Sequence, residues 1–166
     1  DQYMIGWVEY RLTKKNHALN LSYGAISQVL EQNQIHAPSI ADVADAVQSI
    51  RRSKLPDPKI LGNAGSFFKN PIIPAQQAAE LNAQYPDLPI YEAATGWKKI
   101  PAGWLIEQAG YKGFRRNNCG VYEKQALVLV NHGGATGAEM WALAQEIQEA
   151  VREKFGVEIT PEVPIF

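Results

Sequence analysis

The chain has 166 residues, of which 46% are apolar and 20% charged, and its 16 basic and 17 acidic side chains give a net charge of −1. This composition supports a packed core and excludes a disordered chain. The balanced charge excludes a bulk field for holding nucleic acid or an anionic membrane, so we expect neither partner. The longest apolar run, Ala126–Val130, is far shorter than the roughly 20 residues of a membrane-spanning helix.

The cysteine content and the first residues bear on where the protein acts. Cys119 is the single cysteine, which excludes an internal disulfide and fits a reducing, cytoplasmic compartment. No basic segment followed by an apolar stretch begins the chain, so we expect no signal peptide. A strand-like pattern starts almost at Asp1, and we therefore expect the chain to continue a longer protein.

In the first half of the chain, the sequence predicts a strand, a helix and a loop. Tyr3–Leu12 is rich in aromatic and branched residues, which is typical of a strand. Ser39 and Asp42 have the spacing of a capping box, and the apolar residues that follow recur at helical steps as far as Pro56. Residues 59–71 show no helical period and are expected to form a loop and a short strand.

In the second half, the sequence predicts three helices and two strands. The helices are expected at 74–85, at 102–109, and from the cap at Thr136 to Gly156. The strands are expected at 126–131 and 157–163. This order of elements predicts an α+β fold with a small mixed or antiparallel sheet and packed helices.

Two patterns that can mark a ligand site are weak in this sequence. His17, His36 and His132 are isolated from one another and Cys119 has no partner, so we expect no metal site. The segment His132–Gly137 joins a strand to a helix, an arrangement that can bind phosphate at the helix amides. Because its glycine spacing matches no nucleotide-binding motif, we favour a flexible turn into a capped helix.

The glycine-rich loop Gly62–Ser66 is the strongest candidate for chemistry. Glycine adopts positive φ, which lets the backbone approach a ligand closely and presents the Ser66 hydroxyl. Arg51 and Lys54 supply local positive charge, and Asn70 adds a polar amide. Residue chemistry alone slightly favours the alternative of a tight turn with two core phenylalanines and solvated lysines. With no histidine nearby, Ser66 is better suited to donating a proton than to acting as a nucleophile.

Glu162 is the second candidate, because it lies between Pro161 and Pro164 on an otherwise apolar segment. Two prolines hold such a carboxylate rigidly. Protection of an edge strand against aggregation explains the same pattern, and we prefer that explanation on the residues alone.

The segment Lys54–Pro71 resembles the signature of the UDP-N-acetylenolpyruvoylglucosamine reductases, also called UDP-N-acetylmuramate dehydrogenases. It reads Lys-Leu-Pro-Asp-Pro-Lys-Ile-Leu-Gly-Asn-Ala-Gly-Ser-Phe-Phe-Lys-Asn-Pro. The resemblance continues through Tyr23-Gly24, Ala102–Gln108, Lys112-Gly113, Gln125–Asn131 and Pro161–Val163. It is closest to the type I enzymes, which carry a tyrosine-bearing loop, and it is limited to their C-terminal part. The family's flavin-binding region, catalytic arginine and substrate-gripping tyrosine would precede Asp1, so the resemblance implies that this part alone is inactive.

The resemblance implies reduction of UDP-N-acetylglucosamine enolpyruvate to UDP-N-acetylmuramate in peptidoglycan synthesis, with FAD as cofactor and NADPH as co-substrate. Ser66 would then be the proton donor, and Glu162 would help to stabilise the enolic intermediate. Lys54 would bind the substrate near its phosphates. The weaker candidates for substrate binding are Asn70, Gln125 and Arg51.

The resemblance also implies a domain organisation. Residues 1–19 would form a strand and turn that close the preceding flavin-binding domain, 20–158 the substrate-binding domain, and 159–166 a terminal strand that returns toward the flavin domain. That flavin domain and the enolpyruvyl substrate are the expected partners. Two alternatives stay open, namely a stand-alone nucleotide-sugar binding module without redox activity and a purely structural domain.

Overall fold

The computed structural model describes residues 5–22 and 25–165. Contacts within the chain divide it into two compact units, Asp1–Ser53 and Lys54–Phe166. Tyr23-Gly24, which contributed to the family resemblance, and the start of the strand predicted at Tyr3–Leu12 lie outside the described residues.

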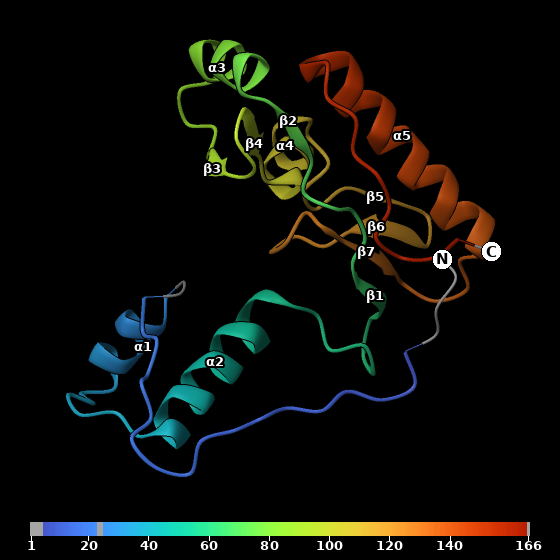
Figure 1. The fold of residues 1–166 in the computed structure, drawn as a ribbon. Helices are drawn as coiled ribbons and strands as arrows, with labels where there is room; N and C mark the ends of the chain where they lie inside the picture. Colours follow the sequence, from blue (N-terminus) through green and yellow to red (C-terminus); the bar gives the residue numbers. More distant parts are fainter. Residues whose placement is uncertain (1–4, 23–24, 166) are drawn as a thin grey trace. The chain divides into compact units, whose positions relative to one another are not determined.

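The first unit is built around two helices, which Figure 1 draws in blue and teal. They are α1 (Ile26–Gln32) and α2 (Ile40–Lys54). The predicted capping box is confirmed, because Asp42 Oδ2 accepts a bond from Ser39 N at 2.8 Å and Ser39 Oγ accepts one from Asp42 N at 3.3 Å. The buried residues that the two helices share are Ile26, Leu30 and Ala46.

The prediction of a strand over Tyr3–Leu12 is wrong for the part that the structure describes. Residues 5–12 have no strand conformation, and Ile5 and Trp7 are 82% and 81% exposed. A strand satisfies its backbone groups by pairing with another strand, and a two-stranded pair alone is only marginally stable. The segment is apolar, but no strand among the described residues pairs with it.

The second unit carries the remaining elements. Its helices are α3 (Ala75–Gln84), α4 (Ala102–Gln108) and α5 (Gly137–Phe155). Its strands are β1 (Gly62–Ser66), β2 (Ile72–Pro74), β3 (Tyr91–Glu92), β4 (Trp97–Lys99), β5 (Arg115–Arg116), β6 (Cys119–Val121) and β7 (Val128–Asn131). All three helices agree with the sequence prediction to within one residue at each end.

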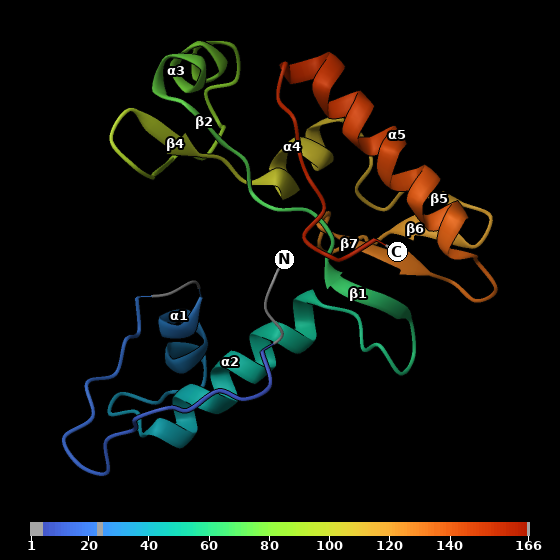
Figure 2. The same ribbon diagram turned by 45° about the vertical axis from the view of Figure 1, so that its right-hand side comes forward.

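The strands of this unit form two small antiparallel sheets, so the predicted α+β class is confirmed. One sheet has the order β1-β7-β6-β5, and the other has the order β2-β4-β3. Helix α5 packs against β6 and β7, and α3 packs against β2 and β4. Helix α4 lies between the two sheets in both Figure 1 and Figure 2.

Helix α5 begins and ends as its sequence predicts. Thr136 Oγ1 accepts a bond from Glu139 N at 3.2 Å, and Glu139 Oε2 accepts one from Thr136 N at 2.7 Å, which completes a capping box. Gly156 follows the last turn at φ 63°, the left-handed conformation that favours glycine. The buried side of the helix carries Leu143, Ala144, Ile147, Val151 and Phe155.

The strand predicted at 157–163 is replaced by a single bridge. Phe68 and Pro161 form an isolated antiparallel bridge, which is flanked by a bond from Lys69 N to Thr160 O at 2.9 Å and one from Glu162 N to Phe67 O at 2.8 Å. Proline has no N–H to donate to a ladder, which limits how far pairing extends here. The segment is therefore attached to the chain just after β1 without forming a strand of its own.

Candidate functional site

The glycine-rich loop forms the edge strand β1 and contains a bulge. Asn63 pairs with Val130 and Ser66 with Val128, so β1 holds one residue more than β7 between these two points. Gly65 has a φ of 75°, which favours glycine, and its N–H donates to Asn63 Oδ1 at 3.0 Å. A bulge bends its strand and changes the direction of the next side chain. Ser66, which follows the bulge, is exposed.

The residue after Ser66 is hydrogen-bonded on both sides. Phe67 N donates to Leu127 O at 2.8 Å, while Phe67 O accepts from Glu162 N at 2.8 Å. Phe67 and Phe68 are buried and anchor this stretch in the core, as the sequence predicts. Ser66 and Glu162 are both exposed. They lie on two segments that are joined by the bond from Glu162 N to Phe67 O, one residue after Ser66.

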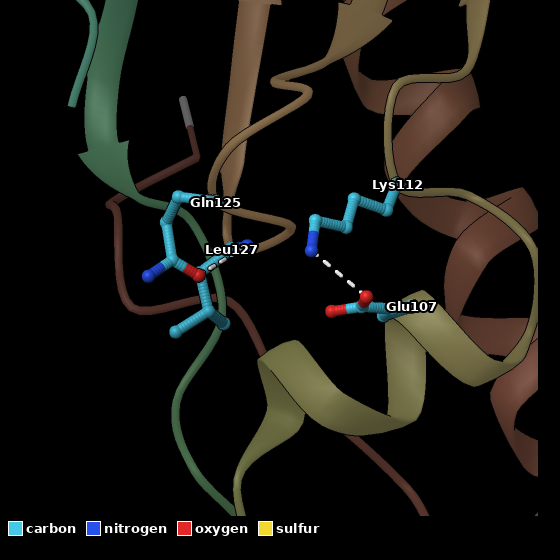
Figure 3. Close-up of polar contacts among 4 residues, drawn as sticks. All are labelled: Glu107, Lys112, Gln125 and Leu127. Carbon is cyan, nitrogen blue, oxygen red and sulfur yellow. Dashed lines mark hydrogen bonds and ion pairs between the residues drawn. The ribbon is translucent and has the colours of Figure 1, made fainter. Parts of the chain in front are cut away.

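Asn70 and Gln125 line a common groove of about 330 Å³ beside α4. Asn70 Oδ1 accepts a bond from Ala102 N at 2.9 Å. Gln125 Oε1 accepts one from Leu127 N at 3.3 Å, and Figure 3 shows this second bond. Backbone N–H groups thus hold both amide oxygens. Within the part of the chain that the structure describes, neither side-chain NH₂ group has a hydrogen-bond partner, so both are able to donate to a ligand.

Arg51 and Lys54 belong to helix α2. Arg51 lies in the first unit, and Lys54 is the last residue of the helix and the first residue of the second unit. Both side chains are exposed. Neither residue lines the groove that contains Asn70 and Gln125, so the structure groups the candidates as Ser66 with Glu162 and Asn70 with Gln125.

The turn His132–Gly137 serves as the cap of α5. The hydrogen bonds from Thr136 lower the pKa of the Glu139 carboxyl, which keeps a negative charge at this helix N-terminus. A carboxylate in that position competes with phosphate for the same amides. Among the described residues no group of three or more His, Cys, Asp or Glu side chains is arranged for a metal ion. No helix within 5–22 and 25–165 has the length and apolar character to cross a membrane.

Residues 57–166 match the family model described as UDP-N-acetylenolpyruvoylglucosamine reductase, C-terminal domain. This match covers more than half of the chain and includes Ser66, Asn70, Gln125 and Glu162. The chain belongs to the UDP-N-acetylenolpyruvoylglucosamine reductase family.

Reductases of this name from several bacteria are similar to the chain. The Chromobacterium violaceum reductase is 55% identical over 155 residues, which cover 93% of this chain and 45% of the relative. The Pseudomonas aeruginosa reductase is 52% identical over 166 residues, covering 100% and 49%, and that of Flavobacterium johnsoniae is 50% identical over 165 residues, covering 99% and 49%. The chain therefore spans about half the length of these curated relatives. The resemblance to the reductase family is confirmed.

Two lysines in the groove received no role from the sequence. Lys112 and Lys124 line it together with Asn70 and Gln125. Lys112 Nζ lies 2.8 Å from Glu107 Oε1 of helix α4, as Figure 3 shows. The Lys112-Gly113 pair is part of the family resemblance, and this was the signal that pointed to the residue.

The residue before Lys112 anchors the loop on which that lysine lies. Tyr111 Oη donates to Glu146 Oε1 at 3.0 Å, and Glu146 Oε2 also pairs with Arg116 Nη1 at 2.7 Å. Burial raises the pKa of the Tyr111 phenol, and the bond to Glu146 raises it further. The phenol therefore stays protonated and keeps donating to α5 over the ordinary pH range.

Proposed function

We propose that this chain is the C-terminal, substrate-binding half of a flavoenzyme that reduces UDP-N-acetylglucosamine enolpyruvate to UDP-N-acetylmuramate with NADPH. The reaction would serve peptidoglycan synthesis in the cytoplasm. Family membership and the half-length match to the reductases support the proposal. The observation that carries it is the pairing that brings the segments of Ser66 and Glu162 together.

The flavin belongs, in this proposal, to a region that precedes the chain. The N-terminus of α5 does not fit a flavin phosphate, because Glu139 already occupies the amide at its cap. The exposed apolar side chains of residues 5–12 are suited to packing against a flavin-binding domain, with residues 1–19 closing that domain and 159–166 returning toward it. When bound, the flavin supplies the hydride.

Ser66 completes the reduction at the substrate. Addition of a hydride to the terminal vinyl carbon leaves negative charge on the carbon next to the substrate carboxylate. Ser66 donates its hydroxyl proton to that carbon, and the serine oxygen regains a proton from water. Glu162, on the paired segment, hydrogen-bonds the enolic form of the carboxylate while the charge is present.

The remaining candidates bind the substrate. The diphosphate of a nucleotide sugar requires positive charge and hydrogen-bond donors. Lys54 supplies the charge closest in sequence to the loop, and Arg51 adds a second cation. The NH₂ groups of Asn70 and Gln125 provide the donors, and Lys112 adds a charge in the same groove.

Replacement of Ser66 tests this assignment in a complete reductase, by which we mean an enzyme whose C-terminal half is this chain. Ser66→Ala should leave flavin reduction by NADPH unchanged, because that half-reaction needs no proton at the substrate. It should slow flavin reoxidation by the enolpyruvyl substrate about 10²–10⁴-fold, the usual contribution of a positioned general acid. Ser66→Cys should recover part of this rate, since a thiol also donates a proton.

Rapid-mixing measurement of the two half-reactions distinguishes the possibilities. Ser49→Ala, at an exposed serine of α2, is the matched control and should leave both rates unchanged. Equal slowing of both half-reactions by Ser66→Ala would mean that the serine only holds the loop together. The proposal for Ser66 would then be wrong.

A further inference from the structure

We propose that Gly103 is a positioning residue for substrate binding, because its missing side chain leaves the room in which Gln125 holds its amide at the groove. The inference rests on the proposed function, in which Gln125 binds the substrate. Gly103 is the second residue of α4 and lines the same groove as Gln125, Leu127 and Asn70.

Local backbone conformation does not explain a glycine at this position. Gly103 lies in the first turn of a helix and is not among the glycines with positive φ. Glycine weakens a helix relative to alanine, because it loses more conformational freedom on folding. The residue therefore carries a cost to α4 that the helix itself does not require.

The neighbours of Gly103 supply the reason. A Cβ atom added at Gly103 would lie 3.2 Å from Gln125 Oε1 and 3.3 Å from Leu127 Cγ, closer than an ordinary van der Waals contact. Gln125 Oε1 is also the acceptor for Leu127 N at 3.3 Å, as Figure 3 shows. A methyl group at Gly103 pushes on the atom that fixes the direction of the Gln125 amide.

Helix α4 is held too firmly to move away from that contact. Its first N–H, from Ala102, is bonded to Asn70, and its residues Leu105 and Ile106 are fully buried. Trp104 packs against Tyr85 and Phe155, with ring centroids 5.9 and 5.8 Å away. The strain of an added methyl group therefore falls on the side chains of Gln125 and Leu127, and Gln125 is the one that carries the free amide donor.

The chain contains a matched control at Gly137. This residue also lies in the first turn of a helix, α5, and a Cβ added there meets no atom within 4 Å. Gly137→Ala thus changes glycine to alanine in the same helical setting without a contact to Gln125.

The test measures KM for the enolpyruvyl substrate, kcat and thermal stability in the complete reductase. Gly103→Ala should raise KM about three- to tenfold, the range of one weakened hydrogen bond, with little change in kcat. Gly137→Ala should leave KM unchanged. Gln125→Ala should itself raise KM by a similar factor, and adding Gly103→Ala to it should raise KM no further, because the two residues act through one contact.

Each outcome decides one point. An unchanged KM in Gln125→Ala overturns the substrate role of Gln125, which belongs to the proposed function. A raised KM in Gln125→Ala with an unchanged KM in Gly103→Ala overturns the positioning role alone, as does an equal effect of Gly103→Ala in both backgrounds. If Gly103→Ala does not fold, the double variant should recover part of the lost stability, because the contact with Gln125 has gone and only the one with Leu127 remains. A double variant no more stable than Gly103→Ala also overturns the inference.

Discussion

Asn70 combines a structural bond with a free donor. Its oxygen accepts the first N–H of α4, a group that no residue of the helix itself can satisfy, and the residue also lines the groove. Pro101, which precedes the helix, provides no side-chain bond, so the N-terminus of α4 is capped by a residue distant in sequence. One residue thus contributes to stability through its oxygen and, in the proposed function, to binding through its nitrogen.

Substitution separates these two contributions. Asn70→Ala should lower the free energy of unfolding by about 1 kcal/mol through loss of the bond to Ala102 N. Asn70→Asp should keep that acceptor and most of the stability, yet raise KM in the complete reductase, because it removes the donor and adds a charge that repels diphosphate. Urea denaturation and substrate titration measure the two effects. Equal losses of stability in both variants would contradict the role of the oxygen.

The sequence predicted the local backbone of the candidate site better than the arrangement of its residues. Glycines around Ser66 marked a loop with a special backbone conformation, and Gly65 at φ 75° confirms that expectation. The pairing of Glu162 with the residue after Ser66 depends on backbone bonds between segments far apart in the chain. No local pattern encodes such a bond, so the sequence alone did not place these two side chains on neighbouring segments.

At the scale of elements, helices were predictable where their ends carry local signals. The capping boxes of α2 and α5 and the glycine after α5 are hydrogen-bonding patterns within four residues of sequence. Helix α1 was not predicted, and its N-cap, Ala25, offers no side-chain bond. The strands β2 to β6 have only two or three residues each, and their stability comes from partners elsewhere in the chain. The strand predicted at Tyr3–Leu12 failed for the same reason, because its apolar pattern does not specify a partner strand.

The cap of α5 gives a stability prediction. Thr136→Ala should lower the free energy of unfolding by about 1 kcal/mol, because the backbone N–H of Glu139 loses its acceptor, Thr136 Oγ1. Thr160→Ala, at an exposed threonine outside any helix, is the control and should have little effect. Chemical denaturation of the two variants at neutral pH makes the comparison.

The same cap predicts a dependence on pH. The Glu139 pKa is lowered in the folded chain by the bonds from Thr136, so its contribution is fully present above the unfolded pKa. That contribution is lost as the pH falls through the lowered, folded-state pKa. The stability difference between the wild type and Glu139→Gln should therefore shrink on going from neutral pH to about pH 3. A difference that stays constant over this range would contradict a role for the ionised carboxylate.

At the scale of the whole molecule, the two units have separate cores. Among the described residues, the buried cluster of the second unit runs from Phe67 onward, whereas that of the first unit consists of Ile26, Leu30 and Ala46. We therefore expect residues 54–166 to fold without 1–53. Expression of 54–166 followed by urea denaturation should give a single cooperative transition. A broad, non-cooperative transition would show that the second unit needs the first.

The chain by itself should neither retain FAD nor oxidise NADPH. The proposed function assigns the flavin to a preceding region. At the N-terminus of α5, the Glu139 carboxylate already accepts the bond from Thr136 N. Absorbance of the purified chain after incubation with FAD and gel filtration measures retention, and NADPH absorbance measures oxidation. Turnover by this chain with enolpyruvyl substrate and added FAD would contradict the assignment.

The bonds around Phe67 also govern when the site is complete during folding. Its N–H and its carbonyl are bonded to Leu127 and Glu162, so three stretches that are far apart in sequence must meet before Ser66 has its final surroundings. Pairings between residues so far apart in sequence form more slowly than α5, which needs only local bonds. A refolding enzyme would regain its helical signal first and its turnover last. We therefore expect catalytic recovery to follow the meeting of these three stretches and not the formation of α5.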